Sequence, residues 1–134
     1  MRNWADLDDD SINTFEQRKN VRLLRNLLWT DERILAVGRA GHPRGRLRSG
    51  LLAATDQRIV FVTERLFRRP FVLSLPFGEV RSIELAEEPL SGTLTLDTAD
   101  GAIRFRYVRP KERTWPLYWR IGERIGQLPL REHS

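Results

Sequence analysis

The sequence predicts a mainly β protein of the α+β class: a seven-stranded antiparallel barrel or sandwich that is capped by a C-terminal α-helix, with an additional N-terminal helix. Three observations predict this fold class. Seven short apolar or alternating runs follow one another between residues 34 and 107, short turns separate most of them, and residues with a helical period stand on either side. Short strands that are joined by tight turns are typical of antiparallel sandwiches and barrels.

The N-terminal helix is expected within residues 11–30. Val21, Leu24 and Leu28 recur at the i, i+3 and i+7 spacing that places side chains on one face of a helix. Arginines occupy the polar side of this helix. Residues 1–10 carry four aspartates, and such an acidic run predicts a flexible, solvated tail.

The seven strands are expected to be short and separated by recognisable turns. Asp56 suits a tight turn, because its carboxylate can accept amide hydrogens within the turn. Pro76 has no N–H to donate to a sheet and marks an edge, a bulge or a strand end. Asp100-Gly101 is typical of a hairpin turn, since glycine accepts positive φ. The expected strands are residues 34–37, 51–54, 59–62, 71–75, 80–85, 93–98 and 103–107.

A second helix is expected to begin at Thr114, which suits the N-cap, and to end at Pro129. Gly122 and Gly126 lie four residues apart and would permit the close approach of another backbone. Close packing on the sheet is the preferred explanation, and contact with a second helix is the alternative. The apolar stripe of this helix is Leu117, Ile121, Ile125 and Leu128.

Composition excludes several classes of site. The chain of 134 residues is the size of one domain, with no apolar run long enough to span a membrane and no signal peptide, so the cytoplasm is the expected compartment. The absence of cysteine excludes disulfides and thiolate chemistry. With only His42 and His133, a histidine triad or a multi-histidine zinc site lacks members. No nucleotide-binding or nucleophile motif occurs, so we expect no enzyme, no cofactor and no metal.

Five short motifs follow one another along the chain. They are Glu32-Arg33-Ile34-Leu35, Gly50-Leu51-Leu52, Thr55-Asp56-x-Arg58-Ile59-Val60-Phe61-Val62, Ser74-Leu75-Pro76 before Val80-Arg81-Ser82-Ile83, and Gly92-Thr93-Leu94-Thr95-Leu96 before Asp100-Gly101. In order and spacing they resemble the small bacterial pleckstrin-homology (PH)-like domains, nearest to the YokE-like group. The resemblance implies a strongly bent seven-stranded sheet that the last helix closes at one end. It does not imply a ligand, because PH-like folds bind lipids, peptides or protein surfaces, or serve as assembly modules.

The resemblance also suggests how the chain is organised. A flexible acidic tail (1–10) precedes the amphipathic helix (11–30), the PH-like domain spans residues 31–128, and residues 129–134 form a C-terminal tail.

The preferred function is a non-catalytic binding module for protein–protein interaction or homo-oligomeric assembly. Tryptophan and arginine are enriched where interfaces bind most strongly. The interface candidates are Trp29, Trp115 and Trp119, together with the exposed edge near Pro76. A core position that caps the barrel is the alternative explanation of Trp115 and Trp119.

The alternative function is peripheral binding of anionic lipid headgroups or other phosphate ligands. The net charge is +5 and 21 of the 23 basic residues are arginines, although such a bias also arises from genome composition. Alternation would place Arg44, Arg46 and Arg48 on one face of an extended strand. The resemblance implies that lipid-binding relatives hold phosphate at this hairpin. The candidate anion-binding residues are Arg39, Arg44, Arg46, Arg48, Arg65, Arg68 and Arg69.

A protein partner or self-association is therefore the first expectation for the partner of this chain. An anionic membrane surface is the second, and it would place the protein at the inner face of the membrane. Nucleic-acid binding ranks last, because net charge supports it and no recognition motif does.

Overall fold

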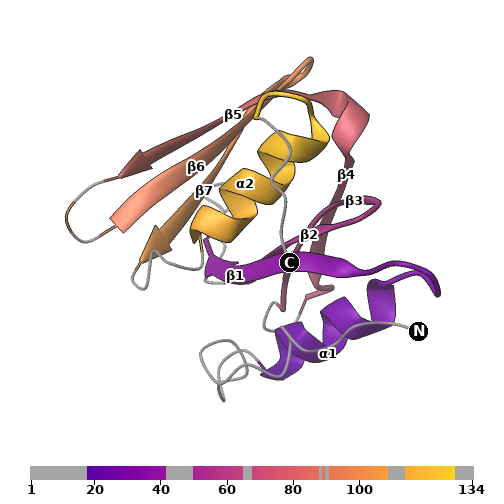
Figure 1. Cartoon of the computed structure of the whole chain (residues 1–134). Helices are drawn as coiled ribbons and strands as arrows, with labels where there is room; N and C mark the ends of the chain where they lie inside the picture. The colour runs from indigo at the N-terminus through magenta and orange to yellow at the C-terminus, as the bar shows by residue number, and fades with distance from the viewer. Residues whose placement is uncertain are drawn as a thin grey trace.

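The computed structural model describes residues 18–41, 50–64, 68–87, 89, 91–108 and 114–128. Within these ranges two antiparallel sheets pack face to face, with a helix at each end of the element order (Figure 1). The first sheet has the strand order β1-β2-β3-β4 and the second has the order β5-β6-β7. The elements are α1 (Arg18–Leu27), β1 (Ile34–Ala40), β2 (Gly50–Thr55), β3 (Arg58–Thr63), β4 (Phe71–Pro76), the 3-10 turn η3 (Phe77–Glu79), β5 (Val80–Glu87), β6 (Ser91–Thr98), β7 (Gly101–Val108) and α2 (Thr114–Arg124).

This architecture confirms the predicted fold class, including the seven strands and the C-terminal helix. β1 is longer than predicted, because Gly38 and Arg39 pair with Leu52 and Leu51 of β2 instead of starting a loop. The turn at Asp100-Gly101 is confirmed, and Gly101 has a φ of 123°.

The central strands of the first sheet are buried on both faces. β2 and β3 have no exposed residue. One face packs against the second sheet and α2 through Leu52 and Phe61. The other face packs against α1, where Leu51 and Val60 meet Leu24. The apolar runs of β2 and β3 are therefore continuous because both faces are covered, and α1 shares a core with the strands.

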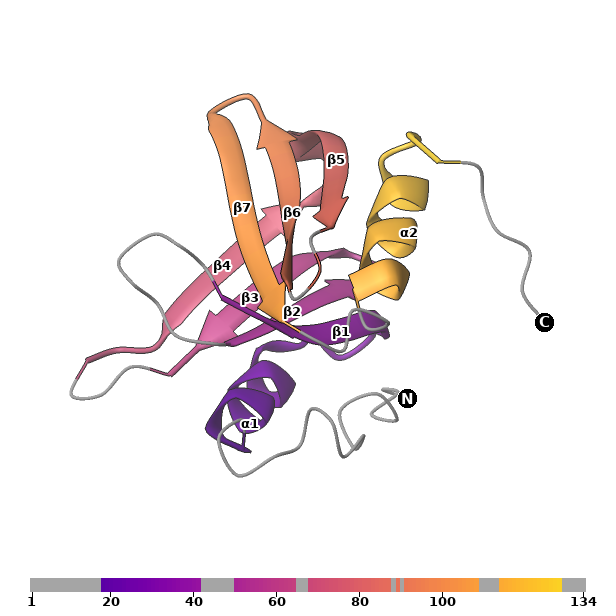
Figure 2. The ribbon, with the colours of Figure 1, turned by 90° about the vertical axis from the view of Figure 1, so that its left-hand side faces the viewer.

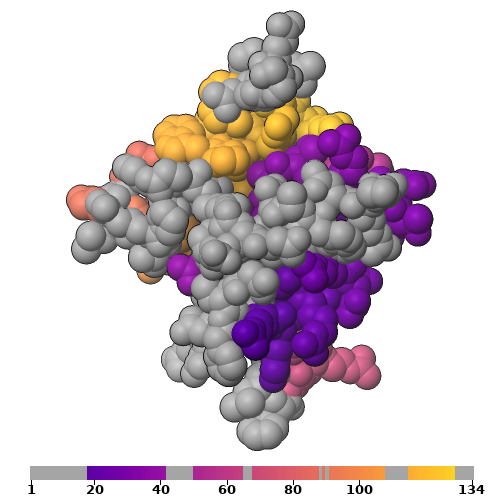
Figure 3. All heavy atoms as spheres, turned by 60° about the horizontal axis from the view of Figure 1, so that its bottom comes forward, coloured from indigo at the N-terminus to yellow at the C-terminus, as the bar shows by residue number. Residues whose placement is uncertain are grey.

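The helix α1 lies on the outer face of the first sheet, while α2 lies on the inner side, against β1 and β5 (Figures 1 and 2). The described part of α1 confirms the predicted apolar stripe, because Val21, Leu24 and Leu28 are all buried. Its other side is exposed on the surface of the molecule (Figure 3). The predicted start of this helix lies outside the described residues.

Buried side chains alternate with more exposed ones along β6, whereas β5 has a register shift between Val80 and Ser82. Leu94 and Leu96 of β6 and Phe105 of β7 are buried in the core between the sheets. The ends of β1 and β7 meet through a bridge between Gly41 and Arg106. Beyond that bridge β4 and β7 remain edge strands, so the two sheets do not close into a complete barrel within the described residues. The position of Pro76 at the end of an edge strand agrees with the prediction.

The end of α2 corrects two expectations. The helix ends at Arg124, before the predicted Pro129. Gly126 has a φ of 80°, its N–H donates to the Glu123 carbonyl at 3.2 Å, and the Gln127 N–H donates to the Gly122 carbonyl at 2.9 Å. This pair of hydrogen bonds is a Schellman C-cap, which favours glycine because of its left-handed backbone. Gly126 thus ends the helix and does not serve as a packing contact.

Candidate functional site

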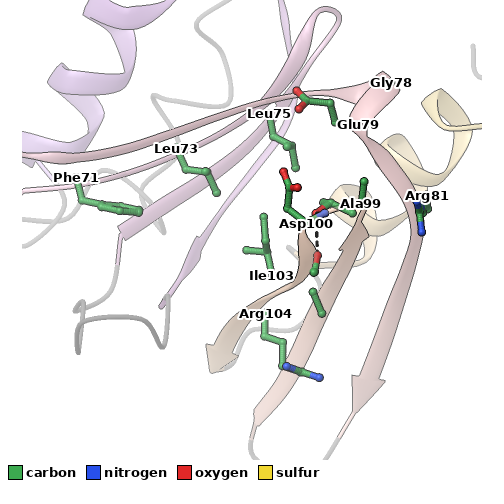
Figure 4. Close-up of a pocket in the computed structure, with 13 residues that line it drawn as sticks. Phe71, Leu73, Leu75, Gly78, Glu79, Arg81, Ala99, Asp100, Ile103 and Arg104 are labelled. Atoms are coloured by element: carbon green, nitrogen blue, oxygen red, sulfur yellow. Dashed lines mark hydrogen bonds between the residues drawn. The ribbon is translucent and has the colours of Figure 1, made fainter.

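An open trough with a volume of about 650 Å³ is lined by β4 on one side and by β7 on the other. β4 and β7 lie on the side of the sheets away from α2 (Figure 2). Phe71, Leu73 and Leu75 of β4 line it from the first sheet, and Ile103 of β7 lines it from the second. Figure 4 shows Leu73 and Leu75 pointing from β4 toward the β6–β7 hairpin. The trough is therefore a largely apolar cleft between two edge strands.

Local sequence explains why these side chains line the trough. Alternate residues of a strand point to opposite faces, so Phe71, Leu73 and Leu75 share the inner face of β4. No described strand lies beyond β4 in the first sheet, and β7 belongs to the second sheet and does not pair with β4. Phe71 and Leu73 consequently stay half-buried, whereas Leu75, nearer the turn into the second sheet, is 8% exposed.

The rim of the trough carries charges of both signs. Glu79 and Asp100 line it at the end where β4 turns into β5, and Arg81 and Arg104 line its other parts. All four side chains are exposed. The two carboxylates and the two guanidinium groups leave the rim without the net positive charge that would favour a phosphate ligand. Among the described residues no group of His, Asp or Glu side chains could hold a metal ion.

The predicted anion site lies elsewhere. Arg39 belongs to β1, and Arg68 and Arg69 directly precede β4, so they lie at opposite edges of the first sheet. Three strand spacings, about 14 Å, separate those edges. The structure therefore does not bring Arg39 together with Arg68 and Arg69. The remaining candidates lie outside the described residues, and the anion site stays a prediction: Arg44, Arg46, Arg48 and Arg65.

The three candidate interface tryptophans fall into two groups. Trp29 follows α1 and is 55% exposed, whereas Trp115 is the second residue of α2 and is 42% exposed. The Tyr118 ring contacts the rings of Trp115 and Trp119 edge-to-face, with centroid distances of 5.7 and 6.4 Å. Trp115 thus does not cap the barrel. The buried core residues of α2 are Leu117 and Ile121. α1 and α2 lie on opposite sides of the first sheet (Figure 1), and Trp29 follows α1, whereas Trp115 and Trp119 belong to α2.

A buried ion pair links the end of α1 to the first sheet. Glu32 is 1% exposed, and its Oε2 accepts hydrogen bonds from Arg58 Nε at 2.9 Å and from Thr55 Oγ1 at 2.6 Å. Arg58 Nη2 donates to Glu32 Oε1 at 3.0 Å and to the Leu27 carbonyl at 2.8 Å, and Arg58 Nη1 donates to Ser74 Oγ at 2.9 Å. The guanidinium therefore holds α1, β3 and β4 together.

The turn between β2 and β3 differs from the prediction for Asp56. Its carboxylate accepts the N–H of Arg33 at 3.0 Å, across to the segment before β1, and not an amide of its own turn. The Thr55 hydroxyl instead accepts the N–H groups of Gln57 and Arg58, each at 3.0 Å. Thr55 closes the turn because its hydroxyl can accept these amides while donating to Glu32.

The surroundings of Glu32 keep it charged. Burial by itself would raise the pKa of this carboxyl, but hydrogen bonds from Arg58, Thr55 and the Trp29 backbone, together with the positive charge of Arg58, outweigh burial and lower the pKa from 4.5. The Arg58 guanidinium also stacks on the Trp29 ring, 4.0 Å from its centroid. These contacts give the ion pair a structural role, since every polar side-chain atom of Glu32 and Arg58 has a hydrogen-bond partner.

Sequence reasoning did not identify the trough as a site. The alternation of Phe71, Leu73 and Leu75 was visible, but an apolar strand face normally becomes fully buried. This face stays open because β4 and β7 are edge strands of different sheets and do not pair with each other, and no local pattern encodes that arrangement.

Comparison with known proteins agrees with the architecture. A family model described as Bacterial PH domain matches residues 11–118. No curated protein matches the chain. The family match does not distinguish the YokE-like group from other members.

Two solved structures show the likeness of the fold. A mutant of the DH/PH domains of p115-RhoGEF matches with a TM-score of 0.52 and 11% identity, covering 97% of this chain and 39% of that one. An N-terminally truncated form of the linker-DH/PH domains of p115-RhoGEF matches with a TM-score of 0.48 and 12% identity, covering 97% and 38%. The chain therefore spans about two fifths of the length of these structures. At such identity the first match supports the fold alone.

Neither of the two described helices has the length and apolar character of a membrane span.

Proposed function

Because the chain belongs to the bacterial PH domain family, we propose that it is a non-catalytic protein-binding module that receives its partner in the trough between β4 and β7. PH domains in general mediate protein or lipid interactions. One observation carries the choice of a protein: the trough is an apolar cleft between edge strands, lined by Phe71, Leu73 and Ile103.

A protein partner fits the trough better than an anionic headgroup does. Burying apolar surface stabilises a complex by about 25 cal/mol for each Å² removed from water. Phosphate would gain little from Leu73 and Ile103, and it would meet the carboxylates of Glu79 and Asp100 at the rim. Arg81 and Arg104 also line the trough, but they equal Glu79 and Asp100 in number, so the rim offers a headgroup no net positive charge.

Two variants of adjacent residues test the proposal. Peptides selected against the full chain from a phage-displayed random seven-residue library serve as the probe. Leu73→Asp should weaken their binding at least about tenfold, because it places a carboxylate against apolar side chains. Val72→Asp is the matched control, since Val72 is 41% exposed and points to the opposite face of β4. Its affinity should stay within about twofold of the unmodified chain.

Circular dichroism of both variants separates loss of binding from loss of folding. If no peptide is enriched, or if folded Leu73→Asp binds as well as Val72→Asp does, the trough is not the binding site and the proposal is wrong.

A further inference from the structure

The backbone of β7 shows which of its residues face away from β6. The Arg106 N–H donates to the Gly41 carbonyl at 2.8 Å, and the Gly41 N–H donates to the Arg106 carbonyl at 2.7 Å. Arg106 thus directs both backbone groups away from β6, toward the edge of the sheet. Because backbone groups of a strand alternate in direction with a period of two, Ala102 and Arg104 direct theirs to the same edge.

These two residues form the open edge of β7. Neither Ala102 nor Arg104 has a backbone hydrogen bond beyond the second sheet within the part of the chain that the structure describes.

The open edge borders the trough directly. Ala102, Ile103 and Arg104 are consecutive, and all three line the trough. Alternate residues of a strand point to opposite faces, so a cleft that contacts three consecutive residues lies along the edge of the strand. Figure 4 shows Ile103 and Arg104 pointing to different sides of β7. An additional strand along this edge would therefore have one row of side chains over Leu73 and Ile103 and the other row on the outer face of the second sheet.

The outer face determines the charge that such a strand should carry. Arg104 and Arg106 are both exposed on it, two residues apart. Neither forms an ion pair with another residue in the described ranges. Cross-strand pairs of opposite charge stabilise a sheet and like charges destabilise it. A second copy of the chain is a poor occupant for this reason, because pairing of two β7 edges would bring the arginines of each copy together.

We propose that the open edge of β7 binds an extended segment of a partner protein as an added antiparallel strand, with apolar side chains facing the trough and acidic side chains facing Arg104 and Arg106. This inference rests on the proposed function and adds the backbone geometry and the sequence pattern of the partner. In an antiparallel pair, residues that exchange both hydrogen bonds have side chains on the same face. The acidic residues of the partner therefore also supply the N–H and C=O groups that bond Ala102 and Arg104.

Synthetic peptides test this geometry with the full, isotope-labelled chain. The probe is an acetylated seven-residue peptide amide of alternating glutamate and valine, which begins and ends with glutamate. Amide spectra should show saturable shifts at Ala102 and Arg104, and the amides of both residues should exchange more slowly with solvent. Methylation of the glutamate backbone nitrogens should reduce the affinity at least about tenfold, since each lost donor weakens the added ladder. Methylation of the valine nitrogens, which face away from β7, should change it less than about threefold.

Charge provides a second arm of the experiment. Replacing glutamate by lysine in the peptide should abolish binding to the unmodified chain, and Arg104→Glu should restore binding of the lysine peptide while weakening that of the glutamate peptide. A peptide of the same composition with four glutamates followed by three valines is the matched control and should not bind.

Several outcomes would overturn the added strand. No shift at Ala102 and Arg104 would do so, and so would equal loss of affinity with either set of N-methyl groups. If the library-selected peptides lose affinity on Leu73→Asp while tolerating methylation at every backbone nitrogen, the trough binds a partner without strand addition. That result would leave the proposed function intact and refute this inference alone.

Discussion

Arg58 Nε lies 2.9 Å from Glu32 Oε2, and the two side chains are buried where the end of α1 meets the first sheet. The pair has additional partners in Thr55 and in the Leu27 carbonyl. Paired burial of this kind is stable only while both charges remain. The Arg58 guanidinium therefore adds a buried polar connection to the apolar core that α1 shares with the strands.

Removing that guanidinium should be strongly destabilising. We expect Arg58→Ala to lower the free energy of unfolding by about 3–5 kcal/mol, since Glu32 would remain buried without its counter-charge. Urea denaturation at neutral pH measures the change. Arg33→Ala is the control, because Arg33 is adjacent to Glu32 in sequence but exposed, and its effect should stay within about 0.5 kcal/mol. An equal effect of the two substitutions would contradict the role of the pair.

The lowered pKa of Glu32 predicts a loss of stability in acid. Its folded-state pKa lies below the ordinary value of 4.5, so the unfolded chain takes up the proton first as the pH falls. The contribution of Glu32 is thus complete above about pH 4.5 and disappears as the pH falls through the folded-state pKa. The difference in unfolding free energy between the unmodified chain and Glu32→Gln should be largest at neutral pH and shrink below pH 4.5. If this difference in unfolding free energy does not change with pH, the charge of Glu32 does not contribute to stability.

The sequence predicted more of the fold than of the site, for a physical reason. Strand positions follow from local alternation, and Leu94, Leu96 and Phe105 indeed face the core. Motif residues such as Thr55 and Arg58 were recognised only as a resemblance, because their partner Glu32 is more than twenty residues away. Hydrogen bonds over such a separation depend on the completed fold.

The trough also could not be predicted from the sequence, because it depends on how the two sheets are arranged. Phe71 and Leu73 are ordinary apolar strand residues in the sequence, and their exposure depends on how the edges of the two sheets lie relative to each other. The arginine alternation at Arg44, by contrast, is visible in the sequence, but residues 42–49 lie outside the described ranges. Its role in anion binding stays a prediction.

The packing of α1 predicts that this helix is required for folding of the strands. Leu24 is fully buried against the outer face of the first sheet. Leu24→Ala should lower the free energy of unfolding by about 2–5 kcal/mol, through lost burial and the cavity left behind. Leu23→Ala should have a smaller effect, since Leu23 is only partly buried. If thermal unfolding of Leu24→Ala matches that of the unmodified chain, α1 is an appendage and not part of the core.

Substitution of Tyr107, unlike that of Leu24 or Arg58, should not lower the free energy of unfolding. Its side chain is buried, and its hydroxyl has no hydrogen-bond partner among the described residues. Tyr107→Phe removes a buried, unsatisfied polar group, so we expect the free energy of unfolding at neutral pH to stay level or to rise by about 1 kcal/mol. Urea denaturation measures this difference. A clear loss of stability would mean that the hydroxyl makes a favourable contact with another part of the chain.

The same substitution should remove a sensitivity to alkali. Burial, together with the negative charge of Glu87, raises the pKa of Tyr107 above 10.0 in the folded chain. As the pH rises through 10.0 the unfolded chain loses this proton while the folded chain retains it, so the unmodified protein loses stability. Tyr107→Phe has no such proton, and its advantage over the unmodified chain should therefore grow above pH 10.0. Tyr118→Phe is the matched control, because Tyr118 is only partly buried, and an equal gain in both variants at high pH would exclude Tyr107 as the cause.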